Sequence, residues 1–135
     1  MKIKSFKGIS EENKLNFKAK VRHHEISMDE PKEAGGDDAA PTPMEYFLAA
    51  IPSCLIATAK LILAKRHLPL PEVEVEVEAQ QSEKPPVVYE KITIKFKFKG
   101  MEKEAAEKLM SSAKKYCPVH AMVNIEEMEI IVETG

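Results

Sequence analysis

Alternation of apolar and polar residues predicts five extended segments in this chain. Residues 2–7 and 15–29 have a strand pattern, residues 72–79 alternate glutamate with valine or alanine, residues 88–99 alternate lysine with isoleucine and phenylalanine, and residues 125–133 form a final strand. The outward face of the third segment is acidic and that of the fourth is basic. Opposite charges suit neighbouring strands, so we expect these two to form an antiparallel hairpin.

Two helices are predicted between the strands. The first runs from about 43 to 66, with Thr42 as its cap and Pro43 in its first turn, and the second runs from 102 to 116. From Tyr46 to Ala59 the first helix is apolar nearly all round, so we expect it to be deeply buried and covered by a second subunit. This stretch is shorter than the ~20 apolar residues that span a bilayer, and we expect no membrane partner.

The order of these elements predicts an α+β fold in which helices lie against an antiparallel sheet. A length of 135 residues fits a single domain over residues 1–135. The net charge of -2 gives no electrostatic reason to expect a nucleic-acid partner. The first residues resemble a strand and not an export signal, which favours a cytoplasmic location.

Two cysteines, Cys54 and Cys117, are the first candidates for chemistry. In a cytoplasmic protein a structural disulfide is disfavoured, so catalytic or redox roles gain weight. A cysteine in an apolar helix can also act simply as a small hydrophobic residue, and local sequence leaves both interpretations open. Neither cysteine has a neighbour at metal-ligand spacing, and His23 and His24 would face opposite ways on a strand. We therefore expect no metal and no cofactor.

A set of short motifs connects these cysteines to a known family. The motifs are Gly35-Gly36, the helix start Pro41-Thr42-Pro43-Met44-Glu45-Tyr46-Phe47-Leu48-Ala49-Ala50, Cys54, and Tyr116-Cys117-Pro118-Val119. In this order and spacing they resemble the OsmC/Ohr family of thiol-dependent hydroperoxide reductases, from about Gly35 to Val132. The resemblance implies an intertwined homodimer, in which antiparallel sheets wrap around long buried central helices and the active site lies at the subunit interface.

The resemblance also implies a reaction. Cys54 attacks a small organic hydroperoxide and becomes a sulfenic acid, Cys117 converts that acid to a disulfide, and an external dithiol, a small molecule or a lipoyl protein, reduces it. Best-studied members place a carboxylate directly after the helix-start proline and use an arginine from the preceding strand region. Here Glu45 stands one position later and Arg22 further upstream, with His23 or His24 as other sources of positive charge. This variant is more similar to the broader OsmC-like branch.

Two alternatives to the peroxidase remain. The first is a binding or carrier module that holds an apolar ligand on the same fold. The second is thiol–disulfide or sulfur-transfer chemistry on a protein partner, which would need Cys54 to be accessible to macromolecules. The apolar helix around Cys54 argues against that second alternative.

Overall fold

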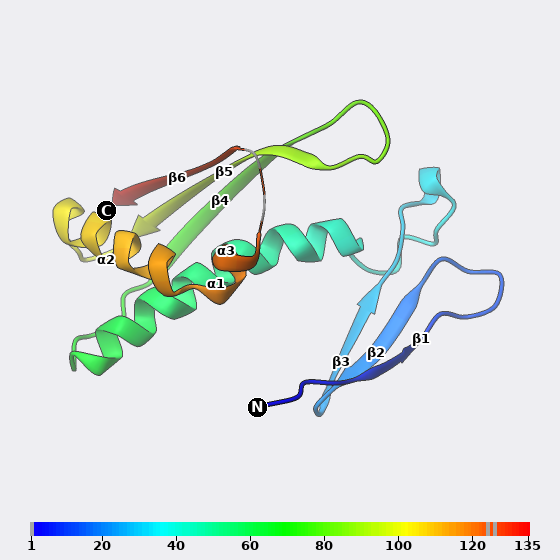
Figure 1. Cartoon of the computed structure of the whole chain (residues 1–135), viewed down its shortest axis with the longest axis horizontal. Coiled ribbons are helices and arrows are strands. Elements are labelled where there is room, and N and C mark those ends of the chain that lie inside the picture. Colours follow the sequence, from blue (N-terminus) through cyan, green and yellow to red (C-terminus); the bar gives the residue numbers. More distant parts are fainter. Residues whose placement is uncertain (1, 124, 126) are drawn as a thin grey trace. The chain divides into compact units, whose positions relative to one another are not determined.

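The computed structural model of the chain describes residues 2–123, 125 and 127–135. These residues form two compact units, one up to Ala49 and one from Ala50 onward, and each is described by itself (Figure 1). The predicted single domain stays a prediction. The helices and strands together confirm the predicted α+β composition.

The first unit contains a three-stranded antiparallel sheet of β1 (Lys7–Ile9), β2 (Phe17–Val21) and β3 (His24–Met28), followed by the 3-10 helix η1 (Lys32–Ala34). The prediction of one extended segment over 15–29 is wrong at its centre. Val21 pairs with His24, so Arg22 and His23 form a tight turn, and Arg22 has a left-handed φ of 56°.

This turn also corrects the prediction for the two histidines. The rings of His23 and His24 lie 3.9 Å apart between centroids and do not face opposite ways, because the backbone reverses direction between β2 and β3. Alternation of side chains holds only along a continuous strand.

The loop after β3 is organised around the buried carboxylate of Asp29. Its Oδ1 accepts the Glu30 N–H at 2.8 Å, and its Oδ2 accepts the N–H groups of Asp37 at 3.2 Å and Ala39 at 3.1 Å. A Cβ on Gly36 would lie 2.0 Å from the Glu30 carbonyl oxygen, so this close backbone approach requires glycine. The loop therefore has a fixed path into the first long helix.

That helix, α1 (Pro43–Lys65), begins where the sequence predicts. The Thr42 Oγ1 accepts the Glu45 N–H at 3.1 Å, and a Glu45 carboxylate oxygen accepts the Thr42 N–H at 2.9 Å. These two reciprocal bonds form a capping box, which satisfies backbone donors at the helix start.

Within this single chain α1 is buried on one face, and the predicted cover of its other faces by a second subunit stays a prediction. The buried residues are Ile51, Pro52, Leu55, Ala59 and Leu63. Four of these, spaced every four positions, form a single stripe, which is the spacing of one helix face. Elsewhere large apolar side chains are exposed, with Phe47 43% and Leu61 63% accessible. The helix is thus buried on one face only within the described chain.

At 23 residues, α1 is longer than the apolar stretch from Tyr46 to Ala59 on which the sequence-based expectation of no membrane partner rested. By length and composition it is apolar enough to cross a membrane, with a mean hydropathy of 2.0 over its most apolar window. Core helices of soluble proteins commonly have the same property, so this is weak evidence for a membrane span.

The second unit also contains a three-stranded sheet, of β4 (Val73–Gln81), β5 (Tyr89–Phe98) and β6 (Glu127–Thr134). The predicted hairpin is confirmed: β4 and β5 are antiparallel, and their glutamates face lysines, as in the pair Glu76 and Lys95. The prediction of a wholly antiparallel sheet is wrong, because β6 runs parallel to β5. Between these strands the chain crosses over through helices, and such a crossover returns it in the same direction.

The crossover consists of α2 (Lys103–Tyr116) and α3 (Pro118–Met122). Figure 1 shows α2 alongside the sheet, and it contacts β6. The side chains that form this core share nearly complete burial; they are Ile92, Ile94, Phe96 and Phe98 from β5 and Ala106, Leu109, Met110 and Ala113 from α2. The packed sheet and α2 fix the position of the residue that follows α2, which is Cys117.

Candidate functional site

The structure brings the two cysteines together. Cys54 lies on α1 and Cys117 between α2 and α3, both in the second unit, and neither is in a disulfide. Their thiols are hydrogen-bonded to each other, with Cys117 donating to the sulfur of Cys54. A hydrogen bond between the two thiols brings their sulfur atoms close together, which disulfide formation requires.

The position of Cys117 is set by the junction of two helices. Its N–H donates to the Ala113 carbonyl at 2.8 Å and closes α2, while its extended backbone (φ -73°, ψ 114°) makes it the N-cap of α3. Pro118 follows as the first residue of α3, where a missing N–H costs no hydrogen bond. The sequence Cys-Pro therefore ends one helix and begins the next with the thiol in the interior.

The first free amides of α3 serve the two sulfur atoms. The Val119 N–H donates to the Cys54 sulfur, and the His120 N–H donates to the Cys117 sulfur at 3.4 Å. Amides at the start of a helix have no partner within the helix, so the sulfurs take the place of a polar cap. Both donors are fixed by the backbone, which keeps them aimed at the sulfurs.

Thr58 completes the surroundings of Cys54. It stands one helical turn later on α1, and its hydroxyl donates to the Cys54 carbonyl oxygen at 2.8 Å. The same hydroxyl is also within hydrogen-bond reach of the Cys54 thiol. A hydroxyl has a single proton to donate, so only one of these acceptors is served at a time.

These contacts favour the ionised form of Cys54. Partial burial raises the pKa of the Cys54 thiol, but hydrogen bonds from the Val119 amide, from Cys117 and from Thr58 together hold it below its usual range. Hydrogen bonds to the charged form always act in this direction. A thiolate, and not a thiol, is the nucleophilic form of cysteine.

Cys117 is in the opposite situation. Burial raises the pKa of its thiol, and although the His120 amide lowers it, donation to Cys54 keeps the proton on Cys117. The side chain is fully buried. The pair is therefore asymmetric: Cys54 loses its proton first, and Cys117 stays protonated beside it.

Glu45 and Arg22, the other two residues singled out from sequence, belong to the first unit. The carboxylate of Glu45 takes part in the capping box of α1. Arg22 lies exposed at the tip of the β2–β3 turn. The first unit has no defined position relative to the thiol pair, so the part of both residues in the chemistry stays a prediction.

Three contacts of the thiols were missed from sequence. Thr58 could have been found, because its spacing of four from Cys54 places both on one face of a helix. The amides of Val119 and His120 had a weaker signal in Pro118, which marks a helix start directly after Cys117. Their approach to Cys54, however, depends on the tertiary fold.

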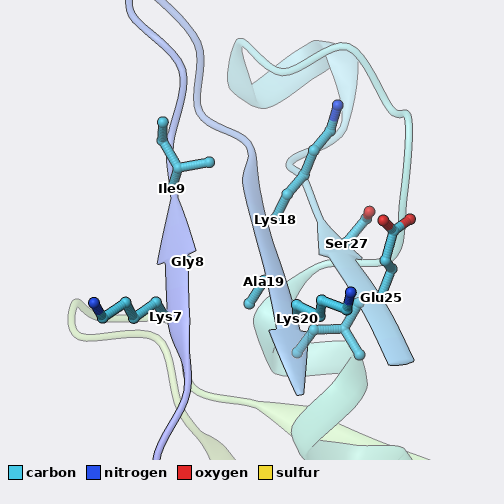
Figure 2. Close-up of a pocket in the computed structure, with 9 residues that line it drawn as sticks. Lys7, Gly8, Ile9, Lys18, Ala19, Lys20, Glu25 and Ser27 are labelled. Atoms are coloured by element: carbon cyan, nitrogen blue, oxygen red, sulfur yellow. The ribbon is translucent and has the colours of Figure 1, made fainter. Parts of the chain in front are cut away.

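The described residues offer no metal site, and a groove over the first sheet does not include either thiol. Among residues 2–123, 125 and 127–135, no group of three or more histidine, cysteine or acidic side chains could hold a metal ion. A groove of about 550 Å³ lies over the first sheet, where Figure 2 shows Lys7, Lys18 and Lys20 on neighbouring strands. It is lined only by residues of β1, β2 and β3 and includes neither cysteine.

Comparison with known proteins gives one family match. The model of the family described as OsmC-like protein matches residues 35–133. No curated protein matches the sequence.

Solved structures share the fold over nearly the whole chain. An osmotic stress induced and detoxification response protein from Psychrobacter arcticus is 16% identical, with a TM-score of 0.83 over 98% of this chain and 97% of that one. A hypothetical protein from Aquifex aeolicus is 28% identical, with a TM-score of 0.80 over 100% and 98%. An organic hydroperoxide resistance protein from Legionella pneumophila is 17% identical, with a TM-score of 0.66 over 100% and 98%.

Proposed function

This chain belongs to the family of OsmC-like proteins, and from that premise we propose that it reduces organic hydroperoxides with Cys54 and Cys117. The family includes organic hydroperoxide resistance proteins, which makes this reaction class the first to consider. The observation that carries the proposal is the hydrogen bond between the two thiols, together with the opposite directions of their pKa values.

In the first step the Cys54 thiolate attacks the terminal oxygen of the hydroperoxide. A sulfur–oxygen bond forms, the oxygen–oxygen bond breaks, and the alkoxide that leaves takes up a proton to become an alcohol. Sulfur is oxidised to a sulfenic acid and the peroxide is reduced. The lowered pKa of Cys54 supplies the thiolate, and its amide donor from Val119 stays in place through the step.

In the second step Cys117 attacks the sulfur of the sulfenic acid. A disulfide forms, the sulfur–oxygen bond breaks, and hydroxide leaves with the Cys117 proton as water. Burial and the hydrogen bond to Cys54 keep Cys117 protonated until its partner has reacted, which favours this order of events. An external dithiol, a small molecule or a lipoyl protein of the cytoplasm, then exchanges with the disulfide and restores both thiols.

The proposal includes a homodimer. Exposed apolar side chains on α1, such as Phe47 and Leu61, would be covered by a second copy, and burial of such surface is the main driving force of association. Glu45, Arg22 and the histidines next to Arg22 remain candidates for activating the thiol in that assembly.

The direct test is consumption of cumene or tert-butyl hydroperoxide in the presence of a dithiol. We expect Cys54→Ser to abolish turnover, because the other cysteine in the sequence, Cys117, is fully buried and its thiol keeps its proton. Cys117→Ser is expected to allow a single reaction at Cys54 without disulfide formation. Wild-type consumption by Cys54→Ser would overturn the assignment.

The same preparation distinguishes the carrier alternative. Native mass spectrometry of protein as purified would reveal a bound apolar molecule if the fold serves as a ligand carrier. A co-purified ligand, combined with thiols that do not react with peroxide, would favour the carrier.

A further inference from the structure

We propose that Thr58 is a further catalytic residue, whose hydroxyl turns from the Cys54 carbonyl to the Cys54 sulfur when that sulfur ionises. The inference deepens the proposed function, on which it rests for the use of Cys54 as the nucleophile. It adds a side-chain donor to the fixed amide of Val119.

The geometry begins with the helix. Thr58 follows Cys54 by four positions on α1, so the two side chains lie on the same face one turn apart. The hydroxyl is held at 2.8 Å from the Cys54 carbonyl oxygen, which fixes it next to the residue that carries the thiol. Rotation about one side-chain bond moves the hydroxyl proton between the two acceptors.

A change of acceptor follows from the charges of the two states. A neutral thiol is a weak acceptor, so the hydroxyl serves the backbone carbonyl. A thiolate carries a full negative charge, and hydrogen bonds to charged groups are about twice as strong as those between neutral groups. Ionisation of Cys54 therefore draws the proton of Thr58 to the sulfur.

The other donors at the sulfur show why such a hydroxyl matters. The thiolate is consumed in the first step, so its donors must be in place before the hydroperoxide reacts; two of them are the Val119 amide and the Cys117 thiol. Thr58 is the third group whose hydrogen bond lowers the pKa of Cys54. Its neighbours Leu55, Ile56, Ala57 and Ala59 are apolar and offer no replacement.

A purely structural role of the Thr58 hydroxyl predicts a different experimental result. Threonine in a helix often donates to the carbonyl four residues earlier, which satisfies its own hydroxyl and nothing more. In that case removal of the hydroxyl would leave the ionisation of Cys54 unchanged. The pH dependence of Cys54 reactivity therefore separates the two roles.

The experiment compares Thr58→Val, Thr58→Ala and Thr58→Ser with wild type in the full chain. The rate at which iodoacetamide alkylates Cys54 is measured against pH, with each cysteine quantified by peptide mass spectrometry. Valine keeps the shape of threonine without its hydroxyl, alanine is the second hydroxyl-free variant should valine disturb folding, and serine keeps the donor. Ser53→Ala is the matched control, because its hydroxyl is next to Cys54 in sequence and is not among the groups that shift the Cys54 pKa.

We expect the apparent pKa of Cys54 to rise in Thr58→Val and Thr58→Ala, with alkylation near neutral pH slowed about tenfold. Thr58→Ser should restore the wild-type profile, and Ser53→Ala should not change it. A wild-type profile in both hydroxyl-free variants, or no rescue by serine, would overturn the proposal.

This test does not depend on peroxide. If the protein proved unable to reduce hydroperoxides, the alkylation profile would still decide whether Thr58 stabilises the thiolate. If the profile did not respond to Thr58, peroxide reduction through Cys54 would still stand.

Discussion

Cys54 and Cys117 have the same side chain, and their surroundings give them different chemistry. Three groups, the Val119 amide, the Cys117 thiol and the Thr58 hydroxyl, lower the pKa of Cys54, whereas Cys117 is fully buried and keeps its proton while it donates a hydrogen bond to Cys54. A nucleophilic cysteine needs hydrogen bonds that stabilise its thiolate. A resolving cysteine needs surroundings that keep it protonated until its partner has reacted. In the proposed reaction, the order of the two steps follows from the amides of α3 and from burial, because the two residues are of the same type.

One prediction at this scale concerns the hydrogen bond between the thiols. Cys117→Ala removes a donor from the Cys54 sulfur, so the pKa of Cys54 should rise and its thiolate fraction at neutral pH should fall several-fold. Cys117→Ser keeps a donor and should stay closer to wild type. Ultraviolet absorbance of the thiolate against pH measures both. Identical titrations for the alanine and serine variants would contradict the role given to this bond.

Sequence alone could identify both cysteines but not their contact. They stand 63 positions apart, and whether their side chains meet depends on the crossover through α2. The family pattern placed Cys117 after a helix and before a proline, which the structure confirms. For the backbone amides at the sulfurs, Pro118 marks only the start of a helix, and their approach to Cys54 depends on the tertiary fold.

At the scale of elements, the loop between β3 and α1 depends on one carboxylate. Hydrogen bonds from the amides of Ala39, Glu30 and Asp37 outweigh burial and lower the pKa of Asp29. A carboxyl whose folded pKa lies below its unfolded value stabilises the fold at pH values above the unfolded pKa of about 3.9. That contribution is lost as the pH falls through the lower, folded pKa.

We therefore expect Asp29→Asn to loosen this loop. An amide side chain has one acceptor oxygen, and its NH₂ group would face N–H donors that now bind the carboxylate. Amide hydrogen exchange of Asp37 and Ala39 should accelerate about tenfold or more at neutral pH, and the variant should lose the acid sensitivity of the wild-type loop. Exchange of α2 amides serves as the internal control. Unchanged exchange at Asp37 and Ala39 would show that the loop does not depend on this carboxylate.

The bounds of the helices were predicted more accurately than the path and pairing of the strands. The helices begin and end within a residue or so of their predicted bounds, because caps and periodicity are local signals. The turn at Arg22 and the parallel pairing of β6 were missed. Arg22 is not a typical turn residue, and strand neighbours are chosen by long-range packing that the alternation of side chains does not record.

At the scale of the whole molecule, α1 carries apolar surface that a single chain leaves exposed. One face of the helix is buried, but apolar side chains elsewhere on it are exposed, and Leu61 is 63% accessible. Exposed apolar surface of this kind commonly marks an interface. The resemblance to OsmC/Ohr proteins predicts that a second copy covers it.

We expect the protein to be a homodimer at micromolar concentrations. Leu61→Glu places a charge on the proposed interface and should raise the dimer dissociation constant by at least tenfold, because burial of an unpaired charge is costly. Val87→Glu, at an exposed apolar residue in the loop between β4 and β5, is the matched control. Analytical ultracentrifugation measures both. A wild-type monomer at these concentrations would contradict the proposed assembly.

The most direct test of the central claim is the intact mass of the reduced protein after one equivalent of an organic hydroperoxide. We predict the loss of two hydrogens, with a single new disulfide between the peptides that contain Cys54 and Cys117. Cys54→Ser should show no such loss. Two free thiols and an unchanged mass in the treated wild-type protein would contradict the claim that this pair reduces hydroperoxides.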